Sequence, residues 1–221
     1  MTEPGRLSEH PDWGYLLRDI YDLYRYRSAG GSARIRSHQR QVRERLLRCM
    51  NDDPEVRLGQ PAVKPVCRHL NRALDNGLDG PAKPVVRGLG TIREALHWQY
   101  GYDKVPSGLA AKYAFAELAG PDGPVRCDAL ILGLVLFAPR CTYPTHSHEG
   151  LVESYICLSG AASENDAGVY VPGSMIYNLP GQLHRITIGT FEPCLLLYAW
   201  VGDPEALAAR QMAFFRPRRE R

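Results

Sequence analysis

Hydrophobic residues recur at helical spacing through the first half of the chain. After Asp12, a typical N-cap residue, apolar side chains return every three or four positions over residues 13–24, which predicts an amphipathic helix. Two glycines within residues 28–32 interrupt this pattern, and a second amphipathic helix is expected beyond them. The apolar face of this second helix is formed by Val42, Leu46, Leu47 and Met50.

Two further helices are expected before the pattern changes. The spacing of apolar residues indicates helices at about 61–77 and 85–100, and Pro81 and Pro84 punctuate the gap between them. We therefore predict that residues 1–105 form a helical N-terminal region.

Beyond Pro106 the pattern changes to short β-rich segments separated by glycine and proline. Many short strands with regular turn signals predict an antiparallel sandwich or barrel. The expected strands are Tyr113–Leu118, Leu130–Phe137, Glu153–Leu158, Gly168–Val171, Ser174–Asn178, Arg185–Ile188 and Cys194–Val201. The sequence thus predicts an α+β fold in which the helical region packs on a C-terminal antiparallel β-barrel of residues 106–221.

Composition narrows the class of protein and its partners. The chain has 221 residues, of which 44% are hydrophobic and 23% charged, as in ordinary globular proteins. A net charge of +3 does not favour a nucleic-acid partner, and the arginine-rich face of the second helix is interrupted by Glu44, which favours a solvated helix face. The longest apolar run, residues 129–138, is too short to span a bilayer.

Cysteine usage and the N-terminus both favour a cytoplasmic location. The six cysteines contain no CxxC pair and no zinc-ribbon spacing, which is typical of reduced thiols in a cytosolic protein. The first six residues lack the apolar segment of a secretory signal. We therefore expect a cytoplasmic protein with neither a nucleic-acid nor a membrane partner.

Three histidines and one glutamate stand out in the β-rich half. His146 and His148 are separated by one residue, so on a strand their side chains point to the same face. Glu153 follows five positions later, and His184 lies beyond a glycine-proline turn. Three imidazoles and a carboxylate suit one divalent transition metal ion with positions left open for substrate, and Zn, Fe, Mn, Ni and Co all fit. The alternative is four polar residues that bind no metal.

Two tyrosines near this set are candidates for chemistry. Tyr155 lies two residues after Glu153 and therefore shares its face on a strand. A phenol beside a divalent cation loses its proton well below its ordinary pKa of ~10, which makes Tyr155 a candidate general base. Tyr143 is expected near the barrel mouth. Alternatively, Tyr155 only lines the barrel, and Tyr143 is an aromatic residue at its rim without a chemical role.

Three further aromatic residues are candidates for substrate binding. Tyr198 and Trp200 share one face of the C-terminal strand, and Tyr177 lies in an earlier strand. Together they offer π faces to a cationic ligand. Taken alone, each of them is better explained by core packing.

The spacing of the ligand set resembles the two cupin motifs. The segment from His146 to Gly160 resembles the first motif, and Gly173 to His184 resembles the second. Arg140 stands where the first motif usually opens with glycine, and the proline of the second lies one position late. The resemblance implies a jelly-roll type cupin barrel for the C-terminal half.

The order His-x-His, Glu-x-Tyr, His resembles more narrowly the cupin-type dimethylsulfoniopropionate lyases of marine bacteria, and in particular the DddL branch. The stretches Trp13-Gly-Tyr-Leu-Leu and Tyr100-Gly-Tyr-Asp-Lys-Val-Pro extend the resemblance over nearly the whole chain. It implies a carbon–sulfur lyase that releases dimethyl sulfide and acrylate. The tyrosine matching Tyr155 would remove the α-proton, and the one matching Tyr143 would hold or gate the substrate.

Two other functions stay open at this point. An iron dioxygenase shares the ligand set, and its dependence on oxygen would separate it from a lyase. A cupin sensor or binding protein would also bind metal but would not need Tyr155. For the lyase, the expected partner is a small zwitterionic sulfonium carboxylate, and the helical extension is a candidate homodimer surface.

Overall fold

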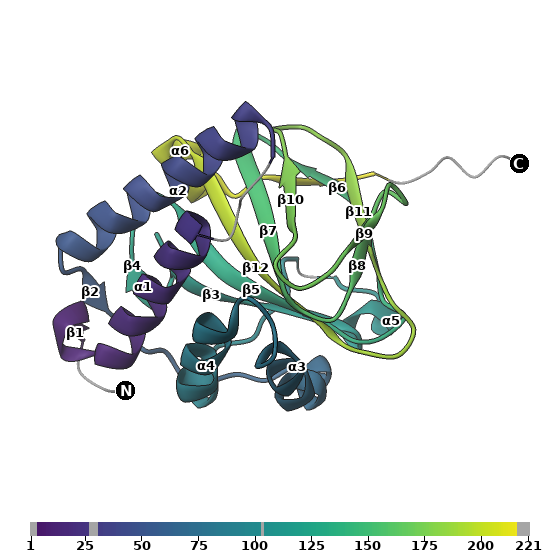
Figure 1. Cartoon of the computed structure of the whole chain (residues 1–221), viewed down its shortest axis with the longest axis horizontal. Coiled ribbons are helices and arrows are strands. Elements are labelled where there is room, and N and C mark those ends of the chain that lie inside the picture. Colours follow the sequence, from purple (N-terminus) through teal and green to yellow (C-terminus); the bar gives the residue numbers. More distant parts are fainter. Residues whose placement is uncertain (1–3, 27–30, 103, 216–221) are drawn as a thin grey trace, which may run out of the picture.

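The computed structural model describes residues 4–26, 31–102 and 104–215 (Figure 1). Its helices are α1 (Pro11–Tyr26), α2 (Ala33–Asn51), α3 (Leu70–Gly77), α4 (Lys83–Ile92), α5 (Ser107–Ala110) and α6 (Pro204–Ala209), with 3-10 turns at Leu7–Glu9, Pro65–His69 and Arg93–Ala95. Within these ranges, no helix combines the length and the apolar character needed to cross a membrane.

The strands form two sheets in the described part of the chain. An eight-stranded sheet has the order β1-β2-β4-β3-β5-β12-β7-β10, and a five-stranded sheet has the order β13-β6-β11-β8-β9. The bounds are β1 Gly5–Arg6, β2 Glu55–Val56, β3 Tyr113–Gly120, β4 Val125–Arg126, β5 Ile131–Phe137, β6 Thr142–His148, β7 Leu151–Ser159, β8 Ala162–Glu164, β9 Val169–Tyr170, β10 Met175–Asn178, β11 His184–Ile188, β12 Cys194–Gly202 and β13 Met212–Phe214. The pairs are antiparallel except β3–β4.

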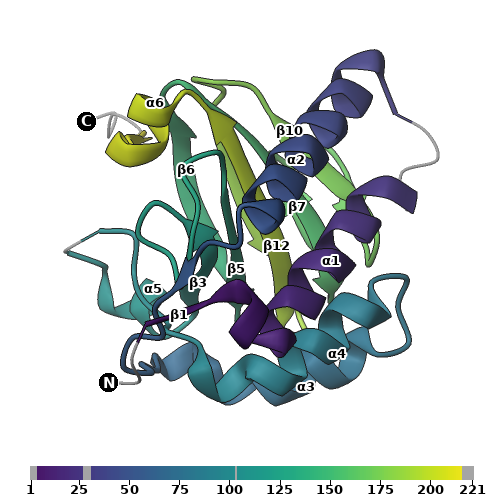
Figure 2. The same ribbon diagram turned by 90° about the vertical axis from the view of Figure 1, so that its left-hand side faces the viewer.

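The larger sheet separates two hydrophobic clusters. Strand β12 shows the division, because Leu195 and Leu197 join the cluster under the helices while Leu196 and Tyr198 join the cluster between the sheets. Figure 2 shows α1 and α2 lying across the outer face of this sheet. Both faces of β12 are therefore buried, which explains its nearly continuous run of apolar residues.

The helices largely follow the predicted pattern. In α1 the buried positions include Trp13 and Tyr24, as the spacing predicts. In α2 the Ser32 side chain accepts a hydrogen bond from the Ile35 amide and caps the helix. Leu47 was expected on the buried face but is 42% exposed. The break predicted at 28–32 lies partly outside the described residues.

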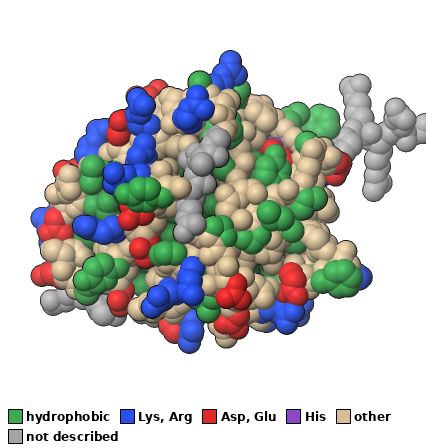
Figure 3. Space-filling model, viewed as in Figure 1, with side chains coloured by type: hydrophobic (Ala, Val, Ile, Leu, Met, Phe, Trp, Pro, Cys, Tyr) green, Lys and Arg blue, Asp and Glu red, His purple; other side chains and the backbone are tan. Residues whose placement is uncertain are grey.

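The arginine-rich face of α2 is a mixed, solvated surface. In Figure 3 basic side chains gather over α1 and α2 at the upper left, with acidic side chains among them. One of the arginines, Arg45, has a structural role, because its guanidinium donates to the carbonyls of Ala129 and Gly202 at 2.7 Å each. The solvated interpretation therefore fits this face, apart from Arg45.

Two predicted helices are shorter than their hydrophobic spacing suggests. Residues 61–64 are not helical, and α4 gives way to a 3-10 turn after Ile92, so the helix prediction for 96–100 was wrong. The Trp98 amide donates to Ala62 at 2.8 Å, and Gln99 pairs with Phe115 of β3. Pairing with other chain segments satisfies these backbone groups and outweighs the helical spacing.

The predicted α+β arrangement of helices on an antiparallel barrel is what the structure shows. Strand β6 is not among the strands expected from runs of hydrophobic residues, because its sequence is mostly polar. One hydrophobic cluster runs from Leu7 through the helices to Val201 of β12, so the two regions share a core. The boundary at 105/106 stays a prediction.

Candidate metal centre

Three strands bring the four proposed ligands together. His146 and His148 lie on β6, Glu153 lies on β7, the next strand along the chain but in the other sheet, and His184 opens β11 directly opposite His146. The candidate ligand atoms of the three histidines all lie within 4.8 Å of one another, and all three residues are buried. The alternation of side chains on β6 thus acts as predicted, because both of its histidines reach the same centre.

Hydrogen bonds fix the orientation of two of these rings. His146 Nδ1 lies 2.9 Å from the Pro144 carbonyl oxygen, and His184 Nδ1 lies 3.0 Å from that of Gln182. A carbonyl only accepts, so Nδ1 carries the proton in both rings and Nε2 is left as the ligand atom.

Several buried ring nitrogens lack a hydrogen-bond partner. Among the described residues these include both nitrogens of His148 and Nε2 of His184. Burial, reinforced by the neighbouring His184 ring, lowers the pKa of His146 to about 3, so this imidazole is neutral at ordinary pH. Buried polar atoms are rarely left unpaired, and Nε2 atoms gathered at one point fit a bound divalent metal, which takes the neutral form of imidazole as its ligand.

Glu153 lies against two of the three imidazoles. Its Oε2 is 3.0 Å from His184 Nε2, and its Oε1 is 3.4 Å from His148 Nε2. Burial alone would raise the pKa of this carboxyl, but the two imidazoles outweigh it and hold the pKa well below its usual range. Trp200 Nε1 donates to Oε1 at 2.7 Å, and Asn178 Nδ2 donates to Oε2 at 3.2 Å. The carboxylate is thus ionised and held in place by two donors.

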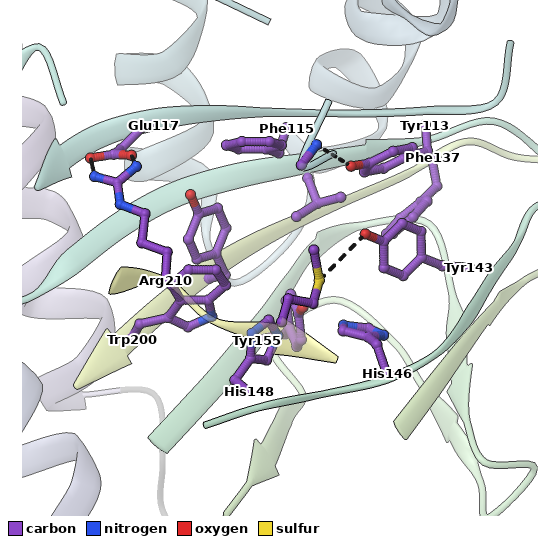
Figure 4. A pocket seen from close by; sticks show the side chains of 14 residues that line it. Tyr113, Phe115, Glu117, Phe137, Tyr143, His146, His148, Tyr155, Trp200 and Arg210 are labelled. Carbon is purple, nitrogen blue, oxygen red and sulfur yellow. Dashed lines mark hydrogen bonds and ion pairs between the residues drawn. The ribbon is translucent and has the colours of Figure 1, made fainter. Parts of the chain in front are cut away.

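A cavity of about 110 Å³ opens onto this centre between the two sheets (Figure 4). It brings together six of the residues singled out in the sequence. Its wall includes His146, His148, Tyr143, Tyr155, Tyr198 and Trp200. Aromatic rings therefore surround the face of the centre that a small ligand would approach.

Tyr155 lies on the inner face of β7, opposite Tyr198 of β12. It is 5% exposed. Burial and the Glu153 carboxylate raise the pKa of its phenol well above the ordinary value. Without a nearby cation the phenol therefore stays protonated, so a role as base requires a positive charge beside it.

Tyr143 packs directly against a proposed ligand. Its ring centroid is 4.9 Å from that of His146, edge to face, and 4.7 Å from that of Tyr113. Its hydroxyl lies 3.9 Å from the sulfur of Met212. Burial raises the pKa of Tyr143 well above its usual value. This side chain forms the cavity wall next to the histidines.

Tyr177 is not brought to the cavity. Its strand neighbour Ile176 pairs with Tyr155, whereas Tyr177 pairs with Ser154 and points toward the helices. Its ring lies 5.3 Å from that of His38 in α2. The prediction of Tyr177 as a substrate contact therefore has no support in the structure, because strand alternation places it on the outer face.

The two charged residues of the cavity wall were missed by sequence reasoning. Glu117 of β3 and Arg210, which ends α6, line the cavity and form an ion pair with Arg210 Nη1 2.8 Å from Glu117 Oε2. A signal for Glu117 was present, because it is the one charged residue in the otherwise apolar run Tyr113–Leu118. Nothing in the sequence near Arg210 marks it as its partner.

Comparison with known proteins identifies the family. Residues 38–196 match the family model of dimethylsulfoniopropionate (DMSP) lyases. A curated protein of Cereibacter sphaeroides named "Putative dimethylsulfoniopropionate lyase DddL" is 50% identical over 220 residues, covering 100% of this chain and 95% of that protein. The chain belongs to the DMSP lyase family. The resemblance stated from the motifs is confirmed, and the protein is a lyase.

Two solved structures share the fold of this lyase. A chain from the crystal structures of the DMSP lyases RdDddP and RnDddQII matches with a TM-score of 0.66 at 20% identity, covering 94% of this chain and 99% of that one. The DMSP lyase DddQ from Ruegeria pomeroyi DSS-3 matches with a TM-score of 0.62 at 18% identity, covering 95% and 99%. The predicted α+β cupin fold is confirmed.

Proposed function

We propose that this chain cleaves DMSP to dimethyl sulfide and acrylate, with one divalent transition metal held by His146, His148, Glu153 and His184. Family membership supports the substrate. The observation that carries the metal proposal is the cluster of three buried histidines whose candidate ligand atoms lie within 4.8 Å of one another. A metal bound there supplies Lewis-acid polarisation of a substrate carboxylate and a positive charge beside the phenols of the cavity.

The reaction needs one base and no acid. Removal of the proton α to the carboxylate leaves an electron pair that forms the double bond of acrylate. The bond between the β-carbon and sulfur then breaks, and its electrons stay on sulfur, which leaves as neutral dimethyl sulfide. This fits a cavity wall rich in aromatic residues, whose acid–base groups beside the histidines are the phenols of Tyr143 and Tyr155.

Tyr155 is our proposed base, on grounds of position. It follows Glu153 by two residues on β7, so both side chains point into the barrel, and it lines the same cavity as His146 and His148. Tyr143 is our proposed holding or gating residue, because its ring forms the wall beside His146.

Tyr198 and Trp200 are our proposed contacts for the sulfonium. Their ring centroids lie 5.3 Å apart, and the Trp200 ring lies 4.5 Å from that of His148. The hydrogen bond from Trp200 Nε1 to Glu153 fixes the indole plane. A sulfonium held over these π faces would be favoured electrostatically, at a position next to the histidine centre.

The test is anaerobic incubation of the protein with DMSP, with dimethyl sulfide measured in the headspace by gas chromatography. Three samples are compared: protein as isolated, protein stripped by a chelator, and stripped protein with one metal restored at a time. We expect release of dimethyl sulfide without oxygen, its loss on stripping and its recovery with at least one metal. A reaction that requires oxygen would indicate a dioxygenase instead, and the absence of turnover with any metal would favour a binding protein.

A further inference from the structure

An ion pair lines the cavity apart from the histidines (Figure 4). Arg210 donates two bonds to Glu117, from Nη1 to Oε2 at 2.8 Å and from Nη2 to Oε1 at 3.2 Å. The Glu117 side chain is 4% exposed and that of Arg210 is 24% exposed. Because both ends of the guanidinium fork are engaged, the pair fixes the relative position of the two backbone segments that carry it.

Those two segments belong to different sheets. Glu117 lies on β3 of the eight-stranded sheet, whereas Arg210 leads from α6 into β13, the last strand of the five-stranded sheet. Strand β13 pairs with the histidine strand β6, with Met212 opposite His148 and Phe214 opposite His146. The ion pair therefore ties the segment that covers the histidine strand to the opposite wall of the barrel.

The Glu117 carboxylate occupies a shaped socket. The β3–β5 register shifts between Glu117 and Ala119, and such a bulge re-aims a side chain. A Cβ atom at Gly120 or at Gly123 would collide with Glu117 Oε1. Burial raises the pKa of Glu117 to about 7, although Arg210 opposes the shift. Burying the Glu117 carboxylate carries a desolvation cost that an apolar side chain at this position would not have.

The Arg210 side of the pair has its own strained geometry. Arg210 is a non-glycine residue with φ of 47° at the end of α6, where its amide bonds to the Ala206 carbonyl. A left-handed conformation at such a residue persists only where the surroundings hold it. Here the chain reverses from α6 into β13, and the ion pair is one contact that holds this turn.

We propose that Glu117 and Arg210 are positioning residues that hold residues 203–215 closed over the cavity. In this arrangement they keep β13 paired with β6, shield the histidines from solvent and keep the substrate enclosed in the cavity. The enclosure of substrate rests on the proposed function, whereas the closure of residues 203–215 does not. Neither side chain takes part in the chemical step.

The experiment compares the metal-loaded wild type with Arg210→Met, which keeps the length of the side chain but loses its charge and fork. Hydrogen exchange followed by mass spectrometry reports on residues 203–215, and chelator competition reports on metal release. We expect exchange in this segment and metal release each to quicken by about tenfold or more. With DMSP, KM should rise by a larger factor than kcat falls, because the pair does not touch the reacting atoms.

The matched control is Arg72→Met, which removes an exposed bidentate pair with Glu192, and neither of these residues lines the cavity. It should leave segment exchange, metal release and turnover unchanged. If Arg210→Met does not fold, the double variant Glu117→Gln/Arg210→Met leaves no lone buried charge and is measured in the same way.

Exchange and metal release within about twofold of wild type in the folded variant would overturn the proposal, even if its thermal stability falls. These two measurements need no substrate. If the wild type releases no dimethyl sulfide, the proposed function fails, while the role of the ion pair is still decided by exchange and metal release.

Discussion

The two faces of strand β7 are both buried, but their polar side chains differ in the contacts that they make. Glu153 and Tyr155 point into the barrel, toward the three imidazoles, where both nitrogens of His148 and Nε2 of His184 lack a hydrogen-bond partner. Ser154, between them, points toward the helices, and its hydroxyl lies 2.9 Å from the Tyr24 hydroxyl and 2.8 Å from His38 Nε2. On the inner face, ring nitrogens stay available to bind a metal. On the outer face, the Ser154 hydroxyl forms hydrogen bonds that join the helices to the sheet.

The largest effect is expected from removal of a proposed ligand on the inner face. His184→Ala deletes one of the three clustered imidazoles and leaves Glu153 with one imidazole contact instead of two. Metal content and dimethyl sulfide release should be lost together. Elemental analysis of the purified variant, alongside the headspace assay, checks this. Full metal content with full activity would show that the site is misassigned.

A smaller effect is expected when a residue that orients a ligand is changed. Trp200→Phe keeps a ring in the cavity but loses the hydrogen bond to Glu153 Oε1. Metal affinity should fall by about 10–100-fold, as is usual when a partner of a ligand is removed. Chelator titration measures the change, and Tyr198→Phe, which retains that bond, is the control. Equal affinities in the two variants would mean that Glu153 does not need Trp200.

The outer face should respond in stability rather than in chemistry. Ser154→Ala leaves the buried Tyr24 hydroxyl and His38 Nε2 without their shared partner, which should cost about 1–3 kcal/mol of the free energy of unfolding. Urea denaturation measures this, and Tyr24→Phe should cost less, because only one bond is lost. Activity should stay within a few-fold of wild type. A loss of metal from Ser154→Ala would show that the two faces are coupled.

The sequence was most informative where local spacing decides the structure. His146 and His148 share a face because they are two residues apart on a strand, and the buried residues of α1 follow the helical period. It was less informative where distant segments decide. Residues 96–100 are extended because Trp98 and Gln99 pair with other parts of the chain, and no local pattern announces those partners.

The two clearest failures at the cavity have different causes. Tyr177 was chosen without the strand register, and its pairing with the outward-pointing Ser154 places it beneath the helices. Glu117 and Arg210 are 93 residues apart in sequence, so only the closed barrel reveals their contact. The first error concerns which face of one strand a side chain occupies. The second concerns a contact between residues that are distant in sequence.

The most direct test makes the same substitution on the two faces of the barrel. Tyr155→Phe and Tyr177→Phe each remove only a hydroxyl, and the elimination rate with DMSP is measured together with metal content. We predict that both variants retain metal, that Tyr155→Phe loses ~10²-fold or more in rate, as expected for a lost general base, and that Tyr177→Phe stays near wild type. A fully active Tyr155→Phe enzyme would contradict the account, and the same assay on Tyr143→Phe would then show whether the base lies there.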